Sequence, residues 1–266
     1  MIVSVISPHT QNNGNTITAI LMALGLADVK KSVFLTHATP RSDVFYNYLG
    51  LHSFEDKTNT PTQLVKLMRD EAIKIEDIGD YCKTIIDGCD VFANNTKTFT
   101  EDDMKELMTR LTDANKYDYM IVDVDENDIT KEIPAMLIER SDIVVFNLTQ
   151  SLSDILEFNK NRDYYMKLTS GKKVIFVCNM FSSTAWAVKD FTKKLGVKTT
   201  ACVVHFNNWI RWGCNNGKLL DVYKFIKLKD PRVIELEKDI VGLASAINKA
   251  RIAIIRNTKG KGGGTA

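Results

Sequence analysis

The chain alternates short apolar runs with segments in which apolar residues recur every three or four positions. Short runs rich in Val, Ile and Phe predict buried β-strands, and the longer repeat predicts helices that bury one face. Strands are expected at residues 2–6, 32–38, 90–94, 119–124, 142–148, 173–179 and 200–206. Helices are expected at residues 16–27, 61–75, 101–111, 153–168, 184–195 and 231–255.

The predicted strands are continuous apolar runs and do not alternate strictly with polar residues. Such strands are covered on both faces, which is typical of a parallel sheet with helices on each side. The pattern therefore predicts an α/β fold with a doubly wound, mostly parallel sheet of about seven strands. We expect one domain over residues 1–257, followed by a disordered basic, Gly-rich tail at 258–266.

Composition indicates a folded chain and favours one cellular compartment. The 266 residues are 44% hydrophobic, which excludes a chain disordered throughout. No apolar run approaches the roughly 18–20 residues that a membrane span needs, and the N-terminus lacks the basic start of a signal peptide. The five cysteines form no CxxC pair, so we expect reduced thiols. These features favour a cytoplasmic protein.

The net charge of +2 hides an uneven distribution. The chain has 35 Lys and Arg against 33 Asp and Glu, and no global field marks it as a nucleic-acid binder. From Lys249 onward it carries five basic residues and no acidic one. A mildly acidic body with a basic end is therefore the more accurate description.

Residues 9–16 form a polar loop between the first predicted strand and helix, where a parallel sheet binds ligands. A phosphate-binding P-loop has the form G-x-x-x-x-G-K-[ST] at this place. Gly14 and Thr16 match it, whereas His9 replaces the first glycine and Asn15 replaces the lysine. Taken alone, Gly14 is equally explained by a positive-φ turn and Thr16 by a helix cap.

Several dispersed segments resemble the ParA/MinD-like branch of P-loop ATPases, the deviant Walker A (SIMIBI) class found on bacterial plasmids and conjugative elements. Its loop, K-G-G-x-G-K-[ST], places its two lysines on Thr10 and Asn15 of this chain. Residues 34–41 resemble the family's strand-two segment, with His37 and Thr39 at its two aspartate positions.

The resemblance continues through the second half of the chain. Residues 117–123 (YDYMIVD) resemble the Walker B strand, in which Asp123 fits the magnesium-linked acid. Residues 141–150 resemble the strand that follows. Asn179 lies where the family has its adenine-contacting asparagine, and residues 203–217 resemble the segment beyond the last strand.

This resemblance implies ATP and Mg²⁺ as ligands. The residues at nucleotide-contacting positions are Gly14, Asn15, Thr16, Asn179 and Asn207. Thr16 and Asp123 would hold the magnesium ion. Thr39 cannot act as a base where the family has the aspartate that orients the attacking water. Asp125 or Glu126, just beyond Asp123, could substitute for it, and Asp123 and Asp125 are weak catalytic candidates.

The absence of Lys and Arg near the loop argues against the binding of ATP. No Lys or Arg occurs between Met1 and Val29. A charge-assisted contact is worth about 1.5–3 kcal/mol, so losing two lowers phosphate affinity by roughly two to four powers of ten. Binding of Mg-ATP and binding of no cofactor at all therefore stand as equal interpretations.

Three functions are consistent with these residues. The first is a dimeric partition or positioning protein that acts mainly as a scaffold, with weak or no ATP hydrolysis. The second is a slow ATPase switch in which Arg211 or Lys218 replaces the lost lysines. The third is an interaction module that needs no nucleotide. Partners expected from the resemblance and from the basic C-terminal end are a second copy, an unknown protein cargo, non-specific DNA or, more weakly, a membrane surface.

Overall fold

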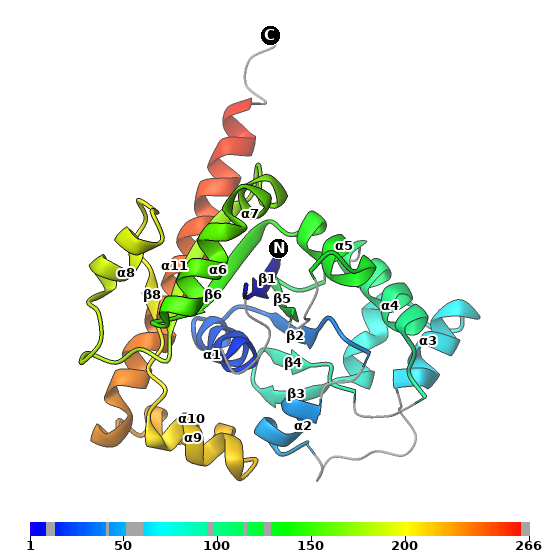
Figure 1. The fold of residues 1–266 in the computed structure, drawn as a ribbon. Helices are drawn as coiled ribbons and strands as arrows, with labels where there is room; N and C mark the ends of the chain where they lie inside the picture. The colour runs from blue at the N-terminus through cyan, green and yellow to red at the C-terminus, as the bar shows by residue number, and fades with distance from the viewer. Residues whose placement is uncertain are drawn as a thin grey trace.

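The apolar runs form the centre of the structure. The computed structural model describes residues 1–8, 14–40, 43–51, 61–94, 98–113, 116–124 and 129–261. Eight strands make one sheet in the order β3-β4-β2-β5-β1-β6-β7-β8 (Figure 1). The strands are β1 (Ile2–Ile6), β2 (Val33–His37), β3 (Lys83–Ile86), β4 (Cys89–Val91), β5 (Tyr119–Val124), β6 (Ile143–Thr149), β7 (Lys173–Asn179) and β8 (Cys202–Val203).

All neighbouring strands run parallel except β3, which pairs antiparallel with β4. Asp123 of β5 lies opposite Val5 of β1 on one side and His37 of β2 on the other. The carboxyl ends of these three central strands therefore meet, as a ligand site in this kind of sheet requires.

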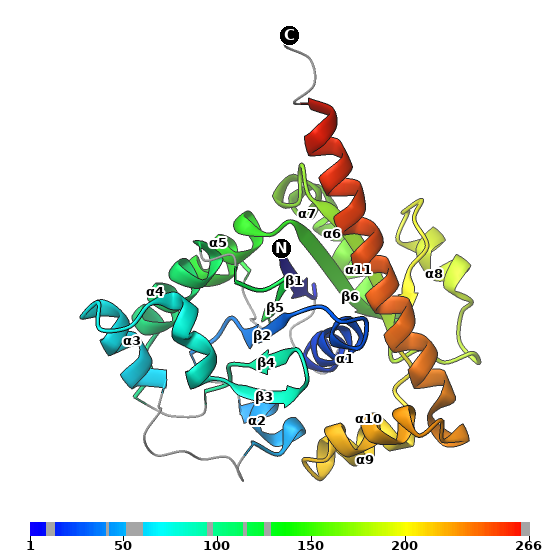
Figure 2. The same ribbon diagram turned by 180° about the vertical axis from the view of Figure 1, so that it is seen from behind.

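Helices cover both faces of the sheet (Figures 1 and 2). One face packs against α1 (Asn15–Asp28), α2 (Asp43–Leu49), α9 (Asn208–Asn215), α10 (Leu219–Lys227) and α11 (Ile234–Lys261). The other face packs against α3 (Pro61–Arg69), α4 (Glu101–Asp113), α5 (Glu132–Arg140), α6 (Leu152–Lys160), α7 (Arg162–Leu168) and α8 (Val188–Lys194). The predicted doubly wound, mostly parallel fold is confirmed.

Side-chain alternation within each strand explains the continuous apolar runs. Val3 and Val5 of β1 belong to the cluster under α1, whereas Ile6 belongs to the cluster on the opposite face. Ile121 and Val122 of β5 divide in the same way. Because both faces are buried, successive residues are mostly apolar.

The sheet has one strand more than the sequence pattern predicted. The run at 90–94 is one arm of a hairpin, in which β3 precedes β4 and the turn contains Gly88 with φ 82°. Strand β3 has the sequence KTII and lies at the edge of the sheet with no fully buried residue. A short, half-exposed edge strand has little apolar pattern to detect.

Several helix boundaries also differ from the prediction. The prediction of a single helix over 153–168 is wrong, because Asn161 with ψ 15° separates α6 from α7. The helix at 61–75 ends at Arg69, since Glu71 adopts φ 53°. The expected strand at 200–206 shortens to β8, and the helix at 184–195 begins only at Val188. Helices α2, α5, α9 and α10 were not predicted.

The C-terminal helix is longer than the apolar stripe indicated. After a short 3₁₀ turn at Pro231–Val233, α11 runs to Lys261 and extends past the sheet (Figure 2). Residues 262–266 of the predicted disordered tail lie outside the described residues. Within the part of the chain that is described, no helix combines the length and apolar character needed to cross a membrane.

Candidate functional site

The amino end of α1 lies at the carboxyl edge of the sheet. Gly14, the residue before α1, has φ 72° and ψ 29°, a left-handed conformation that favours glycine. A Cβ on Gly14 would lie 2.4 Å from Nδ2 of Asn179. Both the backbone and the available space therefore require glycine here, and the positive-φ turn predicted for Gly14 is confirmed.

Thr16 and Asp123 lie together at the end of β5. The Thr16 hydroxyl donates a hydrogen bond of 2.6 Å to Oδ2 of Asp123, and both residues are buried. Gly14 occupies the N-cap position of α1, and no side chain caps this helix. The alternative that Thr16 is only a helix cap is therefore wrong.

This pair is chemically suited to magnesium. A hydroxyl and a carboxylate oxygen at one point are the hard oxygen ligands that Mg²⁺ prefers, and the ion commonly adds phosphate oxygens and waters. The backbone N–H groups and the positive dipole end of α1 supply the anion-binding element that a P-loop uses. The described residues therefore fit Mg²⁺ well and a nucleotide phosphate in part.

Asn15, which the resemblance aligns with the P-loop lysine, is the first residue of α1. Its side chain is 4% exposed, and its amide oxygen is buried with no hydrogen-bond partner among the described residues. Asn15 thus supplies a buried acceptor where a P-loop supplies a cation.

Asn179 connects the end of β7 to the same loop. Its Nδ2 donates to the Gly14 carbonyl oxygen at 3.1 Å, and its Oδ1 accepts from the Met180 N–H at 2.7 Å. Met180 has φ 50°, so Asn179 also stabilises a tight turn beyond the strand. The structure places Asn179 beside Gly14, while its predicted contact with adenine stays a prediction.

His37 lies at the end of β2, beside Asp123 in the sheet. It is 2% exposed, and burial lowers its pKa from 6.5 to about 4, so the ring is neutral at pH 7. The Asn94 N–H donates to Nε2 at 3.3 Å, and Nδ1 lies 3.4 Å from the Thr39 hydroxyl. At the two positions that the resemblance aligns with aspartates, the structure therefore has a neutral imidazole and a hydroxyl.

The other predicted site residues divide into two groups. His9, Thr10 and Asp125 lie outside the described residues. Asn207 is described, and its Oδ1 accepts from the N–H groups of Trp209 and Ile210 at 3.0 Å each. Asn207 therefore caps α9, and its contact with a nucleotide stays a prediction.

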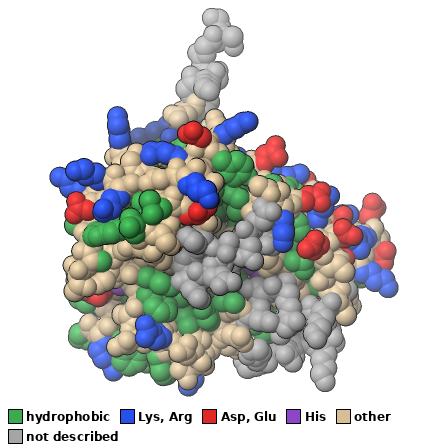
Figure 3. All heavy atoms as spheres, in the orientation of Figure 1, with side chains coloured by type: hydrophobic (Ala, Val, Ile, Leu, Met, Phe, Trp, Pro, Cys, Tyr) green, Lys and Arg blue, Asp and Glu red, His purple; other side chains and the backbone are tan. Residues whose placement is uncertain are grey.

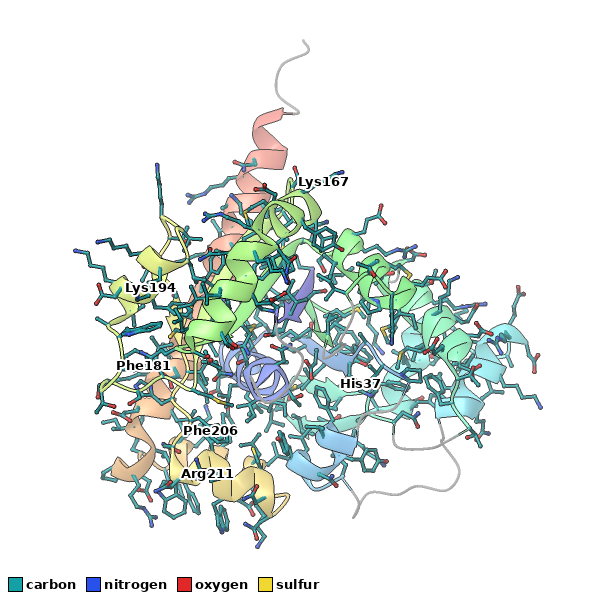
Figure 4. The ribbon with its side chains drawn as sticks, in the orientation of Figure 1. His37, Lys167, Phe181, Lys194, Phe206 and Arg211 are labelled. Atoms are coloured by element: carbon teal, nitrogen blue, oxygen red, sulfur yellow. The ribbon has the colours of Figure 1, made fainter. Side chains whose placement is uncertain are left out.

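Aromatic residues follow β7 and β8 on the side of α1 opposite His37 (Figure 4). The Phe181 ring meets the His205 ring edge to face at 5.1 Å. Asp239 of α11 accepts from the His205 N–H at 2.7 Å and from its ring Nδ1 at 3.0 Å. Burial raises the pKa of Asp239. Sequence analysis missed this pair, because 34 residues separate its members.

Arg211 and Lys218, the proposed replacements for the lost lysines, contact aromatic rings. The Arg211 guanidinium lies 5.8 Å from the Phe206 ring, and the Lys218 ammonium lies 5.8 Å from the Trp212 ring. Trp212 in turn packs against Trp209 at 6.0 Å. These contacts place Arg211 of α9 and Lys218, the N-cap of α10, beside aromatic rings, and their reach toward the P-loop stays a prediction.

Comparison with solved structures identifies the fold. MinD from Pyrococcus horikoshii, the septum site-determining protein complexed with Mg-ADP, is 15% identical with TM-score 0.64, covering 93% of this chain and 96% of its own. A ParA family ATPase from Chlorobium tepidum is 16% identical with TM-score 0.67, covering 91% and 96%. A putative plasmid partition protein from Borrelia burgdorferi, bound to AMPPNP, is 18% identical with TM-score 0.58, covering 86% and 98%.

These likenesses establish the class of fold, that of the MinD and ParA P-loop proteins. No protein-family model matches the sequence, and no curated protein matches it. At 15–18% identity the structures identify the architecture alone, so a function for this chain has to be argued from its own site.

Proposed function

We propose that this protein is a partition- or positioning-type protein that dimerises, binds Mg²⁺-adenine nucleotide weakly and hydrolyses it slowly or not at all. The hydrogen bond between Thr16 and Asp123 carries the proposal, because it joins the two oxygen ligands of a P-loop magnesium site. Gly14 supports it, since a glycine precedes the first helix here as it does in a P-loop.

The weakness of binding follows from charge. The phosphates of ATP carry about three to four negative charges, which P-loop proteins offset with lysine, Mg²⁺ and backbone N–H groups. This chain retains the helix N-terminus and the oxygen ligands but has no Lys or Arg from Met1 to Val29. The neighbours that hold Mg-ADP and AMPPNP give the nucleotide class that the site is proposed to accept.

Slow hydrolysis follows from the end of β2. A water-activating or water-orienting group has to accept a hydrogen bond in the site. His37 Nε2 already accepts from the Asn94 N–H, and the Thr39 hydroxyl is not a base. The scaffold role is therefore favoured over the ATPase switch.

Dimerisation is proposed by analogy with the fold. One neighbour is a MinC:MinD complex from Aquifex aeolicus, so a protein partner has a structural precedent in this fold. The decisive experiment measures the oligomeric state by light scattering, with and without Mg-AMPPNP, alongside a calorimetric titration. Binding that Asp123→Ala abolishes supports the proposal. No heat at millimolar nucleotide would favour an interaction module that works without a ligand.

The charge distribution favours non-specific DNA as one partner. Residues 61–140 contain 10 Lys and Arg against 19 Asp and Glu, whereas residues 141–266 contain 21 against 10. The two segments form opposite edges of the sheet, and basic side chains gather around α7 and α8 (Figure 3). Exposed Lys189, Lys193 and Lys198 make no ion pair with a described residue.

A fluorescence titration with duplex DNA at increasing KCl tests this surface. Binding that falls with the logarithm of salt and is lost in Lys189→Glu, Lys193→Glu supports DNA as the partner. Binding to anionic lipid vesicles but not to DNA would instead assign the membrane-surface role. Exposed Ile252 and Ile255 among the cations of α11 are the residues that such a role would use.

A further inference from the structure

An unsatisfied oxygen lies at the start of α1, between Gly14 and Thr16. The Asn15 side chain is 4% exposed, yet its Oδ1 has no donor among the described residues. A buried acceptor without a partner costs roughly 1–3 kcal/mol, so such an atom normally binds a ligand, a water or an ion. Asn15 is the first residue of α1, and its side chain is directed toward the amino end of the helix, because helical side chains lean toward the helix N-terminus.

A nucleotide phosphate cannot satisfy this oxygen. Phosphate oxygens at neutral pH are acceptors, and an amide oxygen is also an acceptor, so the two repel each other. A group that contacts both has to donate hydrogen bonds or carry positive charge; water can bridge the two oxygens, but only a cation also offsets the phosphate charge. The sequence supplies no Lys or Arg from Met1 to Val29, and Thr16 with Asp123 already accounts for the divalent ion.

We infer that a monovalent metal cation, K⁺ in the first instance, binds at Asn15 Oδ1 and replaces the missing P-loop lysine when a nucleotide is bound. Neutral carbonyl oxygens are ligands that replace the hydration shell of K⁺. A cation at this point neutralises phosphate charge as the lysine ammonium does in a P-loop. This inference rests on the proposed nucleotide binding and specifies what the site needs for it.

Calorimetric titration with Mg-AMPPNP tests the inference, because it measures binding and requires no turnover. The wild-type protein is titrated in KCl and in choline chloride at the same ionic strength. We expect affinity about tenfold to a hundredfold higher in KCl, the effect of one charge-assisted contact. Equal affinity in the two salts would overturn the inference and would indicate that the Asn15 amide group contacts phosphate directly.

Two substitutions of the same residue sharpen the result. Asn15→Lys carries its own cation, so it should bind equally well in both salts. Asn15→Leu has a similar size and no oxygen, so it should bind weakly in both. Thr18→Val is the matched control on α1, because the Thr18 hydroxyl donates to Asn147 at 2.9 Å and should leave the effect of K⁺ intact.

The outcomes separate this inference from the proposed function. If Asn15→Lys binds nucleotide and the wild type binds equally poorly in both salts, the site is a nucleotide site without a K⁺ position. If neither protein binds in any salt, the proposed function fails and the inference with it. Retention of the K⁺ effect in Asn15→Leu would place the ion elsewhere and also overturn the assignment to Asn15.

Discussion

Substituting Gly14 by alanine tests whether close packing or backbone shape holds the loop. The left-handed conformation costs a residue with a Cβ about 1–2 kcal/mol. The added Cβ would also lie 2.4 Å from Asn179 Nδ2, so this amide must move and lose its bond to the Gly14 carbonyl, worth about 0.5–1.5 kcal/mol. We expect Gly14→Ala to lower the free energy of unfolding by about 1.5–3.5 kcal/mol.

Gly171 provides a matched control for the backbone contribution. It has φ 80°, and no described heavy atom lies within 4 Å of the Cβ it would gain, so Gly171→Ala should cost about 1–2 kcal/mol. Urea unfolding followed by circular dichroism measures both variants. The excess at Gly14 should disappear in an Asn179→Ala background, because the clash is then removed. Equal losses for the two glycines, or an excess that survives Asn179→Ala, would refute the packing argument.

Three further changes test other parts of the site. Thr16→Val should abolish the part of AMPPNP affinity that depends on Mg²⁺, and an unchanged EDTA effect in calorimetry would contradict the metal assignment. Asn207→Ala should cost about 0.5–2 kcal/mol in urea unfolding through loss of the α9 cap, and unchanged stability would contradict the capping role. His37 has a pKa of about 4 when folded and about 6.5 when unfolded, so the unfolded chain binds more protons between these values and stability rises with pH there. Between pH 5 and 7 the wild type should therefore gain about 2 kcal/mol more stability than His37→Gln, and parallel pH profiles of urea unfolding would show that His37 does not titrate this way.

The buried strands were predictable because burial on both faces produces a nearly continuous apolar run in the sequence. The runs at 119–124 and 173–179 match β5 and β7 to the residue. The half-exposed edge strand β3 and the break at Asn161 were missed, since both depend on contacts that a periodicity does not contain. The hydrophobic pattern therefore predicted the central strands correctly, but it did not predict the edge strand or the helix break.

The site was predictable to the extent that it follows chain order. Asp123 lies near the end of β5, and Gly14 and Thr16 lie at the start of the helix that follows the neighbouring strand β1, so fold class alone brings them close. Sequence analysis could not show that Thr16 donates to Asp123, because 107 residues separate them and the bond requires the β1–β5 register. The unpartnered Asn15 oxygen was equally invisible, since burial at one atom is a property of packing.

The site separates two requirements that a P-loop normally meets together. Shape comes from Gly14, from the start of α1 and from the Thr16–Asp123 bond, and these are retained inside the packed structure. Charge in a P-loop comes from lysine, and this chain has no Lys or Arg from Met1 to Val29. Loss of the lysine alone would introduce no unfavourable contact. Asn15 adds a buried oxygen that has no hydrogen-bond donor among the described residues, and this destabilises the protein when no ligand is bound. A residue that is unfavourable without a ligand argues for a ligand, which is why the site is better explained by an exchanged cation than by simple decay of a nucleotide pocket.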